Sequence, residues 1–306
     1  MKIGVIGTFI NDQVTLANGE EYTGFGGIYY TVSTLASLLT TEDRIYPVCF
    51  LGEDIFDEVI DNLSGYKNID FSYIRKVPQP NPRVRLIYQD NEMRDEFISN
   101  LVPLLEPEHL QVEVMMDAWL VNFISGFEMA LDTYNQFCHQ QRGLISIDYH
   151  TLALGMDPDG KRFYRRLKDW REWIAGADIL QMNQAEAVSL MGKTDPSEAE
   201  LINFGKQIIN PKTTIFNITL GSKGSLLFFQ QNDKINHLQI QPYPIDNVVE
   251  VTGSGDAFLS GFLVHYLQNR DPIAATHNAN FVAGMQCTIK GTKQFYKLQS
   301  ILKPTK

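Results

Sequence analysis

The stretch that decides the fold lies near the carboxyl end and reads Glu250-Val251-Thr252-Gly253-Ser254-Gly255-Asp256-Ala257-Phe258-Leu259-Ser260-Gly261-Phe262. Two glycines lead directly into an apolar helical pattern. The first N–H groups of a helix have no carbonyl partner within it and lie at the positive end of its dipole, so they attract anions. Glycine also lets a phosphate approach the backbone closely. The segment therefore predicts a phosphate-binding helix start at Gly253, Ser254 and Gly255.

Asp256 falls on the first turn of this helix, where it can accept a proton from a substrate hydroxyl. The helix dipole keeps the carboxylate ionised and only weakly basic. A weak base suffices for phosphoryl transfer, because positioning and charge stabilisation dominate that reaction. The alternative is that Gly-Ser-Gly-Asp merely caps a helix, and the spacing alone does not separate the two interpretations.

On either side of this segment, short apolar strand patterns alternate with longer helical patterns, which is typical of βαβ units around a largely parallel sheet. Strands are expected over residues 2–7, 45–50, 118–124, 143–148, 178–182 and 214–220. Helices are expected over residues 27–39, 55–63, 127–141, 161–174, 196–209, 256–268 and 272–289. We therefore predict an α/β fold.

Two stretches, 13–25 and 71–99, break this rhythm with β-type alternation and no intervening helix. Gln89-Asp90-Asn91-Glu92 reads as the turn of a hairpin. These stretches predict a small antiparallel flap, or lid, on one edge of the main sheet. Because there is no internal repeat and no low-complexity linker, residues 1–306 are expected to form one domain with this lid.

The composition indicates which partners the protein is expected to bind and in which cell compartment it is expected to lie. Lys+Arg number 26 and Asp+Glu 36 in 306 residues, a net charge of −10, which argues against nucleic acid or an anionic membrane as the main partner. Cys49, Cys138 and Cys287 lie far apart, as expected of reduced thiols. Neither a signal-peptide pattern nor an apolar run of about 20 residues is present. We expect a soluble, cytoplasmic protein.

Other nucleotide and metal motifs fail on inspection. Residues 155–162 mimic a P-loop, but Arg162 stands where the magnesium-binding hydroxyl should be. Gly253-Ser-Gly255 continues to Phe258 instead of a third glycine, so a dinucleotide fingerprint is not indicated. The six histidines form no HxxxH pair, which argues against zinc.

Three further segments carry both a functional and a structural interpretation. Asn183-x-x-Glu186 is a capping box for a helix, but it also follows a strand, where Glu186 could hold the hydration shell of Mg²⁺. Thr219–Gly224 joins two strands; it is either a plain turn or a backbone surface for a nucleotide, with Lys223 near a phosphate. Gly26-Gly27 opens a helix and is either a turn or a place where a polyol ring meets the backbone.

In chain order, these segments resemble the ribokinase-like (PfkB) carbohydrate kinase family. The matching segments are Asn11-Asp12, Gly26-Gly27, Asn183-x-x-Glu186, Thr219–Gly224, Gly253–Asp256, Asn278–Ala283 and Lys290-Gly291. They run from about residue 2 to residue 292, essentially the whole chain. The segment Gly253–Asp256 is the most specific part of the match. Because the other segments occur with it in the same order as in the family, a purely structural role for each of them becomes much less favoured.

The resemblance implies a doubly wound, mostly parallel sheet with helices on both faces and a small β lid. It also implies ATP-dependent phosphorylation of a hydroxymethyl group on a sugar or related polyol. Asp256 would orient and deprotonate that hydroxyl, and the N–H groups of Gly253, Ser254, Gly255 and Asp256 would form the anion hole. The other implied site residues are Asn183 and Glu186 for Mg²⁺ and phosphates, Thr219, Gly221, Lys223, Gly224 and Asn280 for ATP, and Asp12, Gly26 and Gly27 for the acceptor.

The chain departs from the family pattern at several positions. Glu250-Val251 replaces the usual Asp-Thr near the family's monovalent-cation site, which leaves activation by K⁺ open. Thr31 stands where the family often places a sugar-binding asparagine, so we expect Thr31 to contact the acceptor. Residues 148–152 lack the arginine of the family's Asp-x-Asn-x-Arg. Only 14 steps separate Asp12 from Gly26, which indicates a trimmed lid and an atypical acceptor.

Two alternatives remain from the sequence. A nucleoside kinase of the same fold would need an apolar wall for the base, and aromatic residues could provide it or simply pack the lid: Phe9, Tyr22, Phe25, Tyr29 and Tyr30. A non-catalytic ligand-binding relative would keep the fold without turnover. Edges of the lid could pair two copies into a homodimer, although a trimmed lid weakens that expectation.

Overall fold

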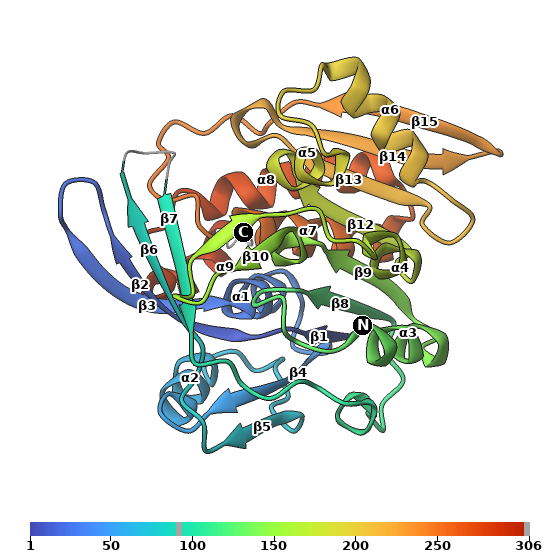
Figure 1. The fold of residues 1–306 in the computed structure, drawn as a ribbon. Helices are drawn as coiled ribbons and strands as arrows, with labels where there is room; N and C mark the ends of the chain where they lie inside the picture. The colour runs from blue at the N-terminus through green and yellow to red at the C-terminus, as the bar shows by residue number, and fades with distance from the viewer. Residues whose placement is uncertain (90–93, 303–306) are drawn as a thin grey trace.

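A mixed sheet organises the computed structural model, which describes residues 1–89 and 94–302 (Figure 1). Its strand order is β15-β14-β13-β12-β9-β8-β1-β4-β5. The strands are β1 Lys2–Ile6, β4 Arg44–Gly52, β5 Ile74–Val77, β8 Ala118–Asn122, β9 Leu144–Asp148, β12 Ile179–Asn183, β13 Ile215–Thr219, β14 Ser225–Gln231 and β15 Lys234–Ile240. Adjacent strands from β5 to β13 are parallel, and β14 and β15 are antiparallel. The six predicted strands are confirmed.

Helices cover both faces of this sheet, because the strands are apolar on both sides. One buried cluster joins β1 to helices α1 Ile28–Leu38, α2 Phe56–Leu63, α7 Ser254–Asn269 and α8 Pro272–Gln286. The other joins the opposite face to α3 Leu131–Gln140, α4 Trp170–Ala175, α5 Gln184–Met191 and α6 Glu198–Ile208. The doubly wound α/β fold predicted from the sequence is confirmed. A further helix, α9 Tyr296–Leu302, was not predicted.

The lid is a four-stranded sheet of its own, in the order β3-β2-β6-β7. Its strands are β2 Phe9–Thr15, β3 Glu21–Gly27, β6 Arg83–Tyr88 and β7 Arg94–Ser99. The expectation of an antiparallel flap is corrected in one respect, because β2 and β6 pair in parallel, whereas β2 with β3 and β6 with β7 are antiparallel. Part of the stretch 71–99 also belongs elsewhere, since β5 pairs with β4 in the main sheet. The predicted turn at 89–92 lies mostly outside the described residues.

The predicted helix over 161–174 is wrong in its first half. A hairpin of β10 Leu154–Met156 and β11 Arg162–Tyr164 occupies this region, and only α4 is helical. The Asp157 carboxylate accepts a hydrogen bond from the N–H of Lys161, and Gly160 adopts a left-handed backbone with φ +83°. The chain therefore reverses direction between the two strands. The hairpin then meets the lid, where Ile98 N donates to Gly160 O (2.9 Å).

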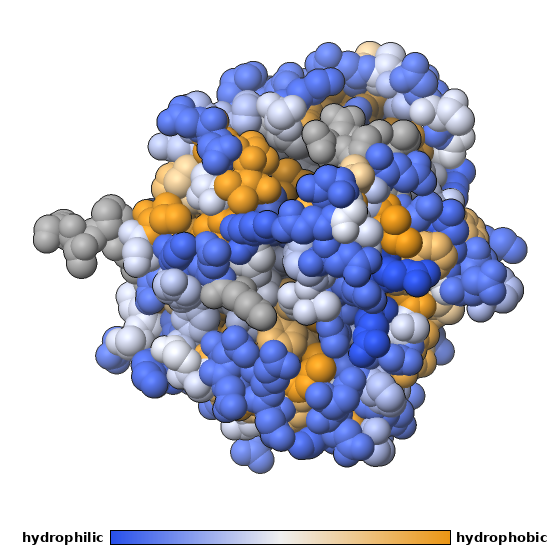
Figure 2. Space-filling model, turned by 90° about the vertical axis from the view of Figure 1, so that its left-hand side faces the viewer, coloured by the Kyte–Doolittle hydropathy of each residue, from blue (hydrophilic) through white to orange (hydrophobic). Residues whose placement is uncertain are grey.

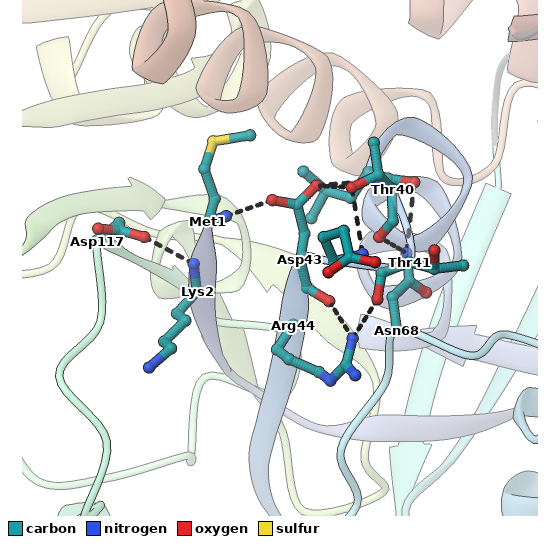
Figure 3. A network of polar contacts seen from close by, with 10 residues as sticks. Met1, Lys2, Thr40, Thr41, Asp43, Arg44, Asn68 and Asp117 are labelled. Carbon is teal, nitrogen blue, oxygen red and sulfur yellow. Dashed lines mark hydrogen bonds and ion pairs between the residues drawn. The ribbon is translucent and has the colours of Figure 1, made fainter.

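A polar network fixes the amino-terminal ends of β1 and β4 (Figure 3). The Asp43 carboxylate accepts hydrogen bonds from the amino group of Met1 and from Thr40 N (2.9 Å) and Oγ1 (2.8 Å). Lys2 N donates to Asp117 Oδ2 (2.7 Å), which ties β1 to the start of β8. The network satisfies strand-end N–H groups that the sheet leaves unpaired.

Within residues 1–89 and 94–302, every helix is too short or too polar to cross a bilayer.

Candidate active site

The site begins where α7 starts, at Gly253. This residue has φ +81°, and a Cβ here would lie 2.3 Å from the Tyr30 ring. Only glycine fits this left-handed, crowded position without strain. Ser254 N donates to Val251 O (3.1 Å), and Ala257 N to Gly253 O (2.9 Å). Helix geometry leaves the N–H groups of Gly255 and Asp256 without a preceding carbonyl, so they can receive an anion.

Two donors fix the Asp256 carboxylate. Its Oδ1 accepts hydrogen bonds from Asn122 Nδ2 (2.6 Å), at the end of β8, and from Thr31 Oγ1 (2.8 Å) on α1. Asn122 Nδ2 also lies 3.1 Å from Thr31 Oγ1. Burial raises the pKa of Asp256, and these hydrogen bonds oppose the rise by stabilising the ionised form. The aspartate is thus held in one orientation with a pKa above its ordinary value, so burial makes it a stronger base than the helix dipole alone predicted.

A cavity of about 530 Å³ lies in front of Asp256, a volume usual for small-molecule sites. At the lid it is lined by aliphatic side chains and two carboxylates: Ile10, Val84, Leu86, Ile124, Asp12 and Glu96. At the opposite end it is lined by residues that end or follow β9, β12 and β13: Asp148, His150, Asn183, Glu186, Thr219 and Gly221. The cavity therefore lies along the carboxyl ends of parallel strands, where α/β proteins bind ligands.

Acidic groups converge beside the anion-hole backbone. Gln181 Nε2 bridges Asp148 Oδ2 (3.1 Å) and Gly255 O (3.0 Å). Burial and the neighbouring Glu186 carboxylate raise the pKa of Asp148. His150 Nδ1 lies 3.2 Å from Glu186 Oε1. Although burial lowers the pKa of His150, Glu186 and the nearby aspartates raise it to about 9. The histidine is thus a cation between carboxylates.

A family model described as pfkB family carbohydrate kinase matches residues 154–297, which contain Asn183, Glu186 and the start of α7. A deoxyribokinase of Salmonella typhi is 23% identical over 316 residues, covering 97% of this chain and 95% of that protein. A cytidine kinase of Thermococcus kodakarensis is 27% identical over 273 residues, covering 88% and 90%. A solved structure of a pyrophosphate-dependent kinase in the ribokinase family has a TM-score of 0.78 at 16% identity, covering 98% and 99%.

The chain is similar to ribokinase-like PfkB kinases, in sequence over residues 154–297 and in fold over nearly its whole length. It shares with these relatives the class of phosphotransferase that uses an alcohol group as acceptor. The family match covers the donor half of the site, and the resemblance in fold covers the lid as well.

The end of the cavity at Glu186 fits Mg²⁺ held through water. Glu186 Oε2 accepts a hydrogen bond from Asn183 N (2.7 Å), and its Oε1 accepts one from Asn183 Nδ2 (2.6 Å). The capping box of α5 therefore also fixes the orientation of the Glu186 carboxylate. No group of three potential ligands is close enough for direct chelation in the described part of the chain. Mg²⁺ in phosphate sites usually keeps several waters and takes one or two carboxylates. Glu186 and Asp148 suit that arrangement.

Some of the site residues predicted from the PfkB pattern line the cavity, and the others lie behind or outside its wall. Those at the cavity wall are Asp12, Gly27, Asn183, Glu186, Thr219, Gly221, Gly253, Ser254, Gly255 and Asp256. Gly26 lies behind Asp12, because a Cβ there would be 1.9 Å from Asp12 Oδ2. Thr31 lies under Asp256 and does not line the cavity. Lys223 and Gly224 follow on a short turn outside the cavity, and Asn280 is buried, donating to Gln241 O (3.1 Å).

Sequence reasoning did not assign Asn122, Asp148, His150 and Gln181 to the site. Each stands in or just after a buried parallel strand, and Asn122 and Asp148 are the last residues of theirs. A polar residue ending an apolar strand was the available signal. Of the aromatic residues weighed as a wall for a base, Phe9, Phe25 and Tyr29 belong to the core, and Tyr30 lines the cavity.

Proposed function

We propose that this protein transfers the γ-phosphoryl group of ATP to a hydroxymethyl group of a sugar or related polyol. The observation that carries the proposal is the position of Asp256. It sits at the start of α7, is oriented by Asn122 and Thr31, and lines a cavity that reaches from the lid to the ends of β12 and β13. An acceptor at the lid end and a nucleotide at the other end would meet at this carboxylate.

The chain's own residues suffice for the positioning steps. Asp256 Oδ2, the oxygen not held by Asn122 and Thr31, takes the proton of the acceptor hydroxyl. The hydroxyl oxygen forms a bond to the γ-phosphorus as the bond from phosphorus to the bridging oxygen of ADP breaks. The N–H groups of Gly255 and Asp256 bind the transferred oxygens. When bound, Mg²⁺ neutralises charge on the phosphates. Glu186 and Asp148 would hold its water shell.

The lid end of the cavity fits an acceptor with hydroxyls and an apolar side. The Asp12 and Glu96 carboxylates can accept hydrogen bonds from hydroxyl groups. The aliphatic side chains of Ile10, Val84 and Leu86 favour contact with carbon. That aliphatic surface supports a second candidate, a nucleoside acceptor whose base lies against it, and one relative is named as a cytidine kinase.

The test is turnover over a panel of pentoses, deoxypentoses, hexoses, sugar acids and nucleosides, with ATP or pyrophosphate as donor. We expect Asp256→Asn to lower kcat by at least about 10³-fold while ATP affinity stays within about threefold. Replacing K⁺ by tetramethylammonium tests the open cation requirement. Retained turnover in Asp256→Asn would refute the assignment of the base. ATP binding without turnover on any acceptor would favour the non-catalytic alternative.

A further inference from the structure

Glu250 lies at a junction of three segments that are far apart in the chain. Its Oε1 accepts a hydrogen bond from the Tyr22 hydroxyl (3.2 Å) on lid strand β3. Its Oε2 accepts from Gly291 N (2.7 Å), in the segment that follows α8. Burial, and then the Glu250 carboxylate, raise the pKa of Tyr22, so the phenol stays protonated and acts as the donor. One carboxylate therefore joins the lid, the loop before α7 and the segment after α8.

The end of α8 holds the loop that leads into the anion hole. Val249 N and Glu250 N both donate to Cys287 O (2.8 and 3.1 Å). Gln286 is almost fully buried, and its Nε2 donates to Thr252 O (2.7 Å). These bonds hold the loop against the carboxyl end of α8.

The lid strand is attached to the same segment. Phe25 N donates to Thr292 Oγ1 (3.2 Å), and Lys290 Nζ pairs with Glu20 Oε1 (3.2 Å). The Lys290–Glu20 pair is about half exposed on both sides, and Lys290 Nζ also lies 5.9 Å from the centre of the Tyr22 ring. The hydrogen bond between Tyr22 and Glu250 is different, because it connects the lid to the loop directly.

The loop has little room to move independently of these contacts. Glu250 is three residues before Gly253, whose backbone lies against the Tyr30 ring. Tyr30 is on α1, which continues directly from β3. A displacement of β3 would therefore act on both ends of the segment 250–253, and that segment sets the direction of the N–H groups of Gly255 and Asp256.

We propose that Glu250 is a positioning residue that, through Tyr22, holds the anion-hole loop in place only while the lid strand is docked. This inference rests on the proposed function. It adds that phosphoryl transfer is coupled to docking of the lid, and that the coupling passes through one hydrogen bond. Hydrogen bonds to a charged group are strong enough for their loss to change a rate about tenfold or more.

Amide hydrogen exchange tests the contact without any acceptor. We expect peptides covering residues 249–256 to exchange at least about tenfold faster in Tyr22→Phe and Glu250→Ala than in the parent protein. The matched control is Glu20→Gln, which removes the charge from another contact between the same two segments, leaves Lys290 beside the Tyr22 ring and should leave this exchange unchanged. Unchanged exchange in both Tyr22→Phe and Glu250→Ala would overturn the proposal, whether or not an acceptor has been found.

Kinetics with the acceptor found by the panel test the coupling. We expect about a tenfold loss of kcat in Tyr22→Phe, the same loss in Glu250→Ala and no further loss in the double variant, with the KM for ATP unchanged. Glu250→Gln can still accept from Gly291 N and bond to the Tyr22 hydroxyl, and should keep kcat within about threefold of the parent. Additive losses, or a lowered melting temperature with an unchanged kcat, would refute the coupling. A parent protein without turnover on any acceptor would instead refute the proposed function.

Discussion

Asn122 helps to orient Asp256, since its amide donates to the carboxylate at 2.6 Å. We predict that Asn122→Ala lowers kcat by about tenfold or more and leaves the KM for ATP unchanged, because the base loses its orientation while the donor end is untouched. Steady-state kinetics with ATP and the acceptor measure this. The control is Asn62→Ala, which removes an exposed bond to Glu58 O. Equal losses in the two variants would contradict the role of Asn122.

Gly253 gives a second prediction at this scale. Gly253→Ala places a Cβ against the Tyr30 ring at a backbone angle that alanine rarely adopts. We expect a loss of about 1–3 kcal/mol in the free energy of unfolding, together with loss of turnover. Denaturant unfolding measures the first. Gly65→Ala, with open space around the added methyl and no left-handed backbone, should be nearly neutral. A fully stable and active Gly253→Ala would show that the loop tolerates a different path.

Single residues of the site differ in how well the sequence reveals them. Asp256 and the glycines before it were predictable, because one helix start carries both the backbone donors and the carboxylate. Asn122 and Gln181 were not, because their partners lie 134 and 74 residues away and only the strand order brings them together. Thr31 shows a further limit. Alignment placed it as an acceptor contact, and the structure gives its hydroxyl to Asp256.

At the level of elements, the paired starts of β1 and β4 depend on Asp43. Burial raises the pKa of Asp43, but hydrogen bonds from the amino terminus and Thr40 outweigh it and lower the pKa below its ordinary value of 3.8. A depressed pKa contributes stability above that value, which is lost as the pH falls through the folded-state pKa.

We predict that Asp43→Asn costs about 1–2 kcal/mol at pH 7 and that the difference from the parent shrinks as the pH falls below about 4. Urea unfolding over a series of pH values measures it. Asp61→Asn, whose side chain is exposed on α2, is the control and should follow the parent throughout. A difference that is independent of pH would exclude the ionised Asp43 as its source.

Elements with strong periodicity were predictable, and those shaped by their neighbours were not. Six of the seven parallel strands are buried on both faces and read as apolar runs, so they were found; β5 lies at the edge of the sheet, is only partly buried and was assigned to the lid. β15 was missed because it lies at the edge of the sheet, where exposed Lys234 and Gln239 interrupt the apolar pattern. The segment 161–174 has helix-forming lysine and arginine, but the turn at Gly160 and pairing with the lid override that preference.

At the scale of the whole molecule, both outer strands of the lid are partly covered by the chain itself. β3 meets Thr292, and β7 meets the hairpin at Gly160. Edge strands covered in this way are poor templates for a second copy. The homodimer expected from the sequence would need one of these edges. We therefore predict that the protein sediments as a monomer at micromolar concentration, and a concentration-independent dimer in sedimentation velocity would contradict this.

The hydrogen bond between Thr31 and Asp256 spans 225 residues and joins the first helix to the seventh. During synthesis, the amino-terminal strands can associate long before the residues that complete the site leave the ribosome. Until α7 and α9 arrive, α1 can pack against β1, β2, β3 and β4, but the part of its surface that contacts α7 and α9 stays uncovered. A ribosome stalled before residue 250 would thus display a nascent chain with a sheet but an exposed apolar face and no activity. This last stage of translation is where the protein most needs a chaperone.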